Sequence, residues 1–155
     1  MNRRIRIAVS LFACTVLLGG CAKPPGGGIP HDALDSAIGA AIGDPSTCVI
    51  LAERVGGKRV YQYGEDFNCT RPLAACDRPG TLTGKGALAL ADTPEGREAS
   101  CPSNPAATRS VGWAEGRVVS TRRDLVFSAV MEGDRALPGR EIAARLADAF
   151  SQAGL

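Results

Sequence analysis

The sequence has few of the side chains that most often build metal and acid–base sites. It contains one histidine, His31, and one tryptophan, and aromatic residues make up 5% of the chain. No pair of its six cysteines has the C-x-x-C spacing that is typical of structural zinc sites. We therefore expect no metal site, and no motif points to another cofactor.

Net charge is also low. The whole chain carries +2, but Arg3, Arg4 and Arg6 lie in a segment that we expect to be removed. Without them 15 basic residues face 16 acidic ones, which gives a net charge of −1. A charge this close to zero gives no electrostatic reason for a nucleic-acid partner.

The longest apolar run near the start, residues 7–18, is too short to span a bilayer.

Residues 1–20 have the form of an export signal, with basic residues ahead of an apolar stretch. The stretch ends in Leu18-Gly19-Gly20-Cys21, which resembles the lipobox of bacterial lipoproteins. The resemblance implies that cleavage leaves Cys21 first and that lipid, including palmitate, attaches it to the membrane. Ala22, where an Asp would favour the inner membrane, implies the outer membrane, with the domain facing the periplasm. A secretory signal with an incidental cysteine is the alternative.

Proline and glycine dominate the residues after Cys21, so residues 21–31 are predicted to be a lipidated cysteine and a flexible tether. Residues 32–155 are long enough for one domain with a single core. This segment keeps four cysteines, an even number in an oxidising compartment, so two disulfides are expected. Three pairings are possible, and we favour Cys69–Cys76 as a local link, with Cys48–Cys101 joining distant segments.

Hydrophobic periodicity predicts a helix at each end of this domain. The first begins at Asp32 and ends at Gly43, and the last begins at Pro138 and ends at Gly154. One antiparallel sheet covered by both helices would bury the apolar faces of both, so the predicted fold class is α+β. Strands are predicted at residues 48–52, 59–63, 81–91, 110–119 and 124–131, and loops at residues 64–80 and 91–104.

This order of elements and several short motifs resemble the serine β-lactamases, class D in particular. Residues 48–63 are similar to the first hairpin of those enzymes, and residues 68–76 to the segment before their nucleophile. Gly112-Trp113-Ala114-Glu115-Gly116, residues 126–131 and the terminal helix look like their last two strands and C-terminal helix. The resemblance implies a single five-stranded antiparallel sheet of order 2-1-5-4-3, covered by the N- and C-terminal helices.

The chain departs from that family at the catalytic motifs. No lysine follows a serine by three positions, so the family's Ser-x-x-Lys is absent, and Lys-Thr-Gly survives only as Lys85-Gly86. An unactivated hydroxyl is a poor nucleophile at neutral pH. We therefore expect no catalytic residue, and a non-catalytic protein rather than an enzyme. An atypical hydrolase would have to use a hydroxyl such as that of Thr81, Thr83 or Ser110.

Three functions remain open. The first, which we favour, is a non-catalytic lipoprotein that binds an envelope protein or a peptidoglycan fragment. Its candidate ligand-binding residues are Lys85, Trp113 as an aromatic platform, and Arg71 as a carboxylate ligand. The second is a penicillin-recognising hydrolase, either a β-lactamase or a peptidase. The third is a structural subunit of an envelope assembly, extended by a partner strand along residues 81–91. A core Trp113 and an ion-paired Arg71 are the structural alternatives.

Overall fold

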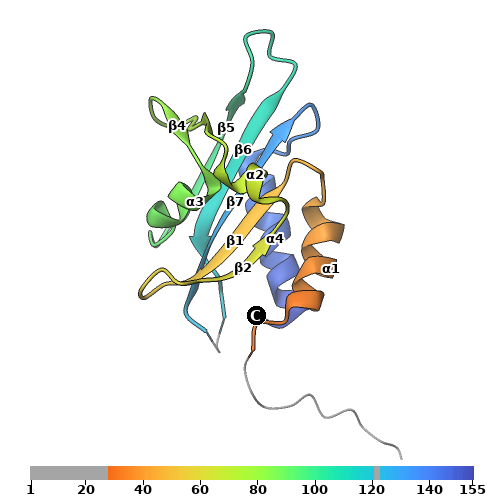
Figure 1. Cartoon of the computed structure of the whole chain (residues 1–155), viewed down its shortest axis with the longest axis vertical. Helices are drawn as coiled ribbons and strands as arrows, with labels where there is room; N and C mark the ends of the chain where they lie inside the picture. The colour runs from red at the N-terminus through yellow and green to blue at the C-terminus, as the bar shows by residue number, and fades with distance from the viewer. Residues whose placement is uncertain (1–27, 121–122) are drawn as a thin grey trace, which may run out of the picture.

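The computed structural model describes residues 28–120 and 123–155. The predicted export signal, the lipidation site Cys21 and most of the tether lie outside these described residues. A five-stranded antiparallel sheet runs through the domain, with helices and loops on its two faces (Figure 1). Within the described ranges, no helix is both long enough and apolar enough to cross a bilayer.

The strands of the main sheet lie in the order β2-β1-β7-β6-β5. Numbered only among themselves along the chain, these strands have the order 2-1-5-4-3, so the predicted topology and the α+β class are confirmed. All residues of the central strand β7 are buried, because both faces of the sheet are covered. The strands are β1 (Cys48–Glu53), β2 (Arg59–Tyr63), β5 (Arg97–Pro102), β6 (Ser110–Arg117) and β7 (Leu125–Gly133).

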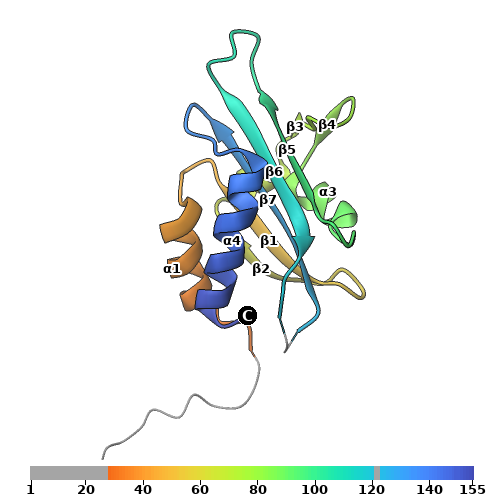
Figure 2. The same ribbon diagram turned by 180° about the vertical axis from the view of Figure 1, so that it is seen from behind.

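Two helices, α1 (His31–Ile42) and α4 (Gly139–Ala153), cover one face of the sheet (Figure 2). Helix α4 ends where the sequence predicts, since Gly154 has a φ of +84°, a conformation that glycine adopts without steric cost. Helix α1 begins one residue before the predicted Asp32. Both predicted apolar faces are buried, through Leu34, Ile38 and Ile42 of α1 and Ile142, Leu146, Ala149, Phe150 and Ala153 of α4.

The opposite face of the sheet is covered by residues 64–91, which we call the cover layer (Figure 1). Little of this layer is regular structure, and its two short strands pair only with each other. Beneath it lie four fully buried side chains of the sheet: Ile50, Val111, Trp113 and Val130. The elements of the layer are α2 (Asp66–Thr70), β3 (Leu73–Ala74), β4 (Thr81–Leu82), α3 (Gly84–Ala87) and the 3-10 turn η1 (Leu88–Leu90).

Residues 81–91 do not form the predicted strand, and the structure shows why. Only the first two residues form a strand, and the side chain of Thr83 then caps α3 by accepting a 2.9 Å hydrogen bond from the Gly86 amide. A Cβ on Gly84 would lie 3.0 Å from Sγ of Cys48 and 3.2 Å from the carbonyl oxygen of Cys69. The segment therefore folds tightly over the start of β1 instead of extending the edge of the sheet.

The remaining strand of the sheet is β5, which lies within residues 91–104, a segment that the sequence predicts to be a loop. This strand lies at an edge, and its residues alternate between half-buried and exposed. An edge strand tolerates charged side chains and a terminal proline such as Pro102, because one side of its backbone has no partner strand. Its polar composition is therefore typical of a loop, although its backbone is a strand.

The four cysteines of the domain form two disulfides, as expected, but the favoured pairing is wrong. The bonds are Cys48–Cys69 and Cys76–Cys101, with Cα–Cα distances of 5.2 and 5.4 Å. Both bonds join the cover layer to the sheet, one to β1 and the other to β5. A bond between Cys69 and Cys76 would have closed only a local loop, without a covalent link between the cover layer and the sheet.

The start of α4 packs closely against β5 and β6. The amide of Gly139 donates a 2.7 Å hydrogen bond to Oγ of Ser100, and a Cβ on Gly139 would lie 2.1 Å from the carbonyl oxygen of Trp113. A Cβ on Gly112 of β6 would lie 2.0 Å from the carbonyl oxygen of Leu137. Both glycines are thus required by the close approach of two backbones.

We predict that Gly139→Ala lowers the free energy of unfolding by about 1–3 kcal/mol, the usual cost of overpacking. Alanine is the better helix former by about 1 kcal/mol, so a gain in stability would be expected if the close contact were absent. Urea unfolding followed by circular dichroism measures the change. The control Arg140→Ala, at an exposed position of the same helix, should change stability by less than about 0.5 kcal/mol.

A second prediction concerns the two disulfides. Each closes a loop of similar length, with sequence separations of 21 and 25 residues, so replacing either pair by alanine should cost about 3 kcal/mol. Urea midpoints of the two double variants measure this cost. Peptide mapping of the unreduced protein should recover the Cys48–Cys69 and Cys76–Cys101 links, and a Cys69–Cys76 link would contradict the pairing.

Candidate functional site

Trp113 lies in the core rather than on the surface. Its side chain is fully buried, and its indole Nε1 donates a 2.8 Å hydrogen bond to the carbonyl oxygen of Ala74. The ring packs under the cover layer, on the face of the sheet opposite to α4. It offers no exposed aromatic face to a ligand. Instead, the indole joins β6 to the short strand β3.

The other two candidate ligand-binding residues lie on or beside the cover layer's helices. Lys85 of α3 is exposed, and its Nζ lies 2.9 Å from Oδ1 of Asp66 on α2. Arg71 follows α2, with its guanidinium 5.7 Å from the centre of the Phe67 ring. The structure thus brings Lys85 and Arg71 to the same part of the cover layer, through α2, and leaves Trp113 beneath it.

Arg71 belongs to a cluster around the carboxylate of Glu132, which is only 6% exposed. Glu132 accepts hydrogen bonds from Arg109 at 2.8 and 2.9 Å, from Ser103 at 2.7 Å and from Arg71 at 3.2 Å. These donors, Arg109 above all, lower the pKa of Glu132 to about 2. The cluster joins the end of β7 to the β5–β6 connection and to the residue after α2.

A second buried carboxylate, Glu115 of β6, has a different environment. Its side chain forms an ion pair with Arg97 on the neighbouring strand β5, and Arg97 also binds Asp77 and the carbonyl oxygen of Ala75. The other oxygen of Glu115, Oε2, is buried and has no hydrogen-bond partner among the described residues. Burial therefore raises the pKa of Glu115 to about 7. Arg97 and Arg78 hold the pKa of Asp77 far below its usual range.

Neither of these two glutamates is among the candidate residues that the sequence predicts. Both point to the cover-layer side of the sheet, in step with the alternation of side chains along each strand. On β6 the series is Val111, Trp113, Glu115, and on β7 it is Ser128, Val130, Glu132. The sequence does contain a signal for such residues: a charged residue at an inward position of a buried strand requires a partner. The partners Arg97 and Arg109 are distant in sequence and could not be identified from it.

The strand β2 forms one open edge of the main sheet. Beside it lies a hollow of about 320 Å³ lined by Arg59, Val60, Tyr61, Gln62 and Asp66. The hydroxyl of Tyr61 donates a 2.6 Å hydrogen bond to Asp35 of α1, which holds this strand against the helix.

An exposed aromatic side chain borders the same region, since Phe67 on α2 is 68% exposed. Asp66 of α2 interacts with both neighbouring elements: it binds Lys85 of α3, and its pKa is lowered by Lys85 and by Arg59 and Gln62 of β2. We call the region the β2–α2 surface and define it by Arg59, Gln62, Asp66, Phe67 and Lys85.

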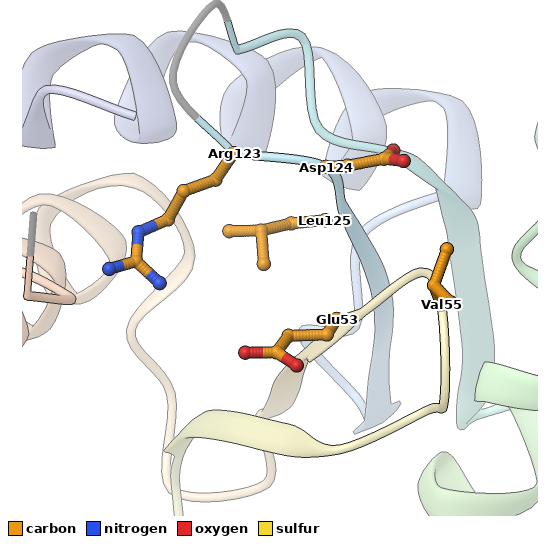
Figure 3. Close-up of a pocket in the computed structure, with 5 residues that line it drawn as sticks. All are labelled: Glu53, Val55, Arg123, Asp124 and Leu125. Atoms are coloured by element: carbon orange, nitrogen blue, oxygen red, sulfur yellow. The ribbon is translucent and has the colours of Figure 1, made fainter.

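A second hollow, of about 250 Å³, lies where the β1–β2 and β6–β7 connections meet (Figure 3). The side chains of Glu53 and Arg123 lie on one side of it with Leu125 between them, while Val55 and Asp124 lie on the other. Beside it, Arg54 binds Asp124, with its Nε and Nη2 2.7 and 2.6 Å from the two carboxylate oxygens. This ion pair ties the two connections together.

Within residues 28–120 and 123–155, no group of three or more His, Cys, Asp or Glu side chains is arranged to hold a metal ion. The hydroxyls considered as atypical nucleophiles do not share one environment. Thr81 is exposed on β4, Oγ1 of Thr83 caps α3, and Ser110 is half-buried at the start of β6. Lys85, the remnant of the family's Lys-Thr-Gly motif, binds Asp66.

Comparisons of the chain with protein-family models, with curated proteins and with solved structures find no match. The sheet order that the β-lactamase resemblance implied is present, but the relationship itself stays a prediction. The same holds for the lipoprotein resemblance, whose residues lie outside the described ones.

We predict that Glu115 makes stability fall as pH rises between about 4.5 and 7. Its pKa in the folded protein, about 7, lies above the ordinary value of 4.5, so within this window the folded state binds more protons than the unfolded state. The contribution is on the order of 2–3 kcal/mol across the window.

The glutamine of Glu115→Gln cannot titrate, so the free energy of unfolding of this variant should change less with pH across this window than that of the unmodified protein. Urea unfolding at a series of pH values measures the two slopes, and a constant loss of stability in the variant does not affect the comparison. Glu98→Gln, at an exposed position of β5, is the matched control and should keep the original slope. Equal slopes for Glu115→Gln and the unmodified protein would show that Glu115 ionises normally.

Proposed function

We propose that the protein is a non-catalytic, lipid-anchored protein of the bacterial cell envelope that binds an extended segment of another envelope polypeptide along β2. Export is supported by the two disulfides, which form and persist in oxidising compartments. The anchor is supported by the Leu18-Gly19-Gly20-Cys21 motif and by the Pro- and Gly-rich residues after it. As proposed, the domain faces the periplasm from the outer membrane.

The open edge of β2 is the observation that carries the proposed binding mode. An edge strand presents unpaired backbone N–H and C=O groups, which a further strand can pair with. The sequence of β2, Arg-Val-Tyr-Gln-Tyr, is rich in residues that favour strands and has no proline. The opposite edge, β5, ends in Pro102, and its Ala99 packs against Gly139 at the start of α4. Strand addition is therefore favoured at β2.

The β2–α2 surface provides side-chain recognition next to this edge. Phe67 offers an exposed ring to an apolar side chain, and Arg71 stacks behind that ring. Lys85 and Asp66 supply one charge of each sign on exposed side chains, so the partner segment is expected to carry complementary charges. The candidate residues Lys85 and Arg71 thus keep a role in this proposal, whereas Trp113 supports the layer from below.

We predict that a photo-crosslinking amino acid at Gln62 or Phe67 captures an envelope polypeptide in intact cells. The same residue at Glu98, an exposed position on the opposite edge, should give several-fold less adduct. Mass spectrometry of the adduct should place the crosslink in an extended segment of the partner. Probes at alternate positions of β2 should capture neighbouring residues of that segment. Equal capture from Glu98 would contradict edge selectivity, and capture of a peptidoglycan fragment alone would replace the polypeptide by a glycan ligand.

Two further measurements test the remaining parts of the proposal. The mass of the N-terminal peptide reports whether Cys21 carries lipid. A fluorescent penicillin tests the absence of covalent chemistry: labelling that is lost on replacing Thr81, Thr83 or Ser110 would favour the penicillin-recognising hydrolase instead.

A further inference from the structure

The start of the described chain and its C-terminus lie at one end of the domain. Both views place the start of α1 and the C-terminus there, together with the end of β6 and the start of β7 (Figures 1 and 2). The β5–β6 connection lies at the opposite end of the long axis. Any anchor on the N-terminal segment is therefore attached at a defined end of the molecule.

Two exposed apolar side chains lie toward this end. Val119, just after β6, is 96% exposed, and Val55, in the β1–β2 connection, is 74% exposed. Among the large apolar residues of the described chain only Phe67 is comparably exposed, and it belongs to the β2–α2 surface. Each valine would gain about 1.5 kcal/mol or more if its side chain left water.

Basic side chains accompany these valines. Lys58 in the β1–β2 connection and Arg123 before β7 have no ion-pair partner among residues 28–120 and 123–155. The nearby carboxylate of Asp124 is neutralised by Arg54, while Glu53 lies on the same side of the hollow as Arg123, with Leu125 between them (Figure 3). Unpaired lysine and arginine next to apolar side chains favour contact with an anionic lipid surface.

The length of chain before Gly28 limits which part of the domain can reach a bilayer. Seven residue steps separate Cys21 from Gly28, which span at most about 25 Å when fully extended. A domain of this size has a radius of gyration of about 14 Å and is thus roughly 35 Å across. A lipid on Cys21 therefore keeps Gly28 within about 25 Å of the membrane, so the end that carries Gly28 meets the bilayer with the least extension of the tether.

We propose that the end formed by Val55, Lys58, Val119 and Arg123 rests on the bilayer that holds the lipid of Cys21. The two valines enter the interfacial region, and the two basic side chains contact anionic headgroups. This inference rests on the proposed lipid anchor. It adds a fixed orientation, in which the anchor and the protein surface bind the same membrane. The short tether strengthens the surface contact, because it raises the effective concentration of the bilayer at that surface.

The test uses the full-length protein purified from the membranes of a lipidating host and reconstituted into vesicles of phosphatidylcholine and phosphatidylglycerol with brominated acyl chains. Val119→Trp places a fluorescent reporter at the proposed contact. Ala106→Trp places one at an exposed position of the β5–β6 connection. The buried Trp113 contributes the same background to both variants. We expect the brominated lipid to quench Val119→Trp several-fold more strongly than Ala106→Trp.

The charge contribution is tested in the Val119→Trp background. Adding Lys58→Glu and Arg123→Glu should reduce the quenching severalfold in vesicles that contain phosphatidylglycerol, whereas Arg140→Glu on α4 should leave it unchanged. Equal quenching of the two reporters on a protein whose Cys21 carries lipid would overturn the orientation and leave the anchor intact. Absence of lipid on Cys21, read from the mass of the N-terminal peptide, would overturn the anchor and the orientation together.

Discussion

The need to bury both faces of the central strands governs this structure. β7 is buried along its whole length and β1 along nearly all of its length, so each face of the sheet requires its own cover. On one face the cover is two amphipathic helices that bury large aliphatic and aromatic side chains. On the other face it is a layer with little regular structure and few large apolar residues. That layer depends on other kinds of attachment.

Those attachments are covalent and polar. The two disulfides join the layer to β1 and β5, and the hydrogen bond from Trp113 to Ala74 joins it to β6. Arg97 extends from β5 to Asp77 and to the carbonyl oxygen of Ala75. Because these contacts carry so much of the attachment, the layer can expose Phe67, Asp66 and Lys85 on α2 and α3 without losing its position. The proposed binding surface is thus fixed from below by the core.

The two buried glutamates illustrate how the surroundings of a side chain decide its charge. Glu132 accepts hydrogen bonds from three residues, and its pKa falls to about 2. Glu115 has one arginine partner and one oxygen without a partner in the described part of the chain, and its pKa rises to about 7. Both occupy inward positions of neighbouring strands on the same face of the sheet. What separates them is the number of donors that distant segments bring to each carboxylate.

The sequence by itself determined the elements whose apolar pattern is strong: both terminal helices and the strands β1, β2, β6 and β7. The resemblance to β-lactamases added the sheet order, and the even number of cysteines, with the predicted export, indicated two disulfides. Only the tertiary structure decided the pairing of the cysteines, the identity of β5 as the remaining strand, and the helix at Gly84. It also decided the burial of Trp113 and the partners of Glu115 and Glu132. The physical reason is that hydrophobic periodicity is a local property of the chain, whereas these features depend on which distant backbone or charge lies next to each residue.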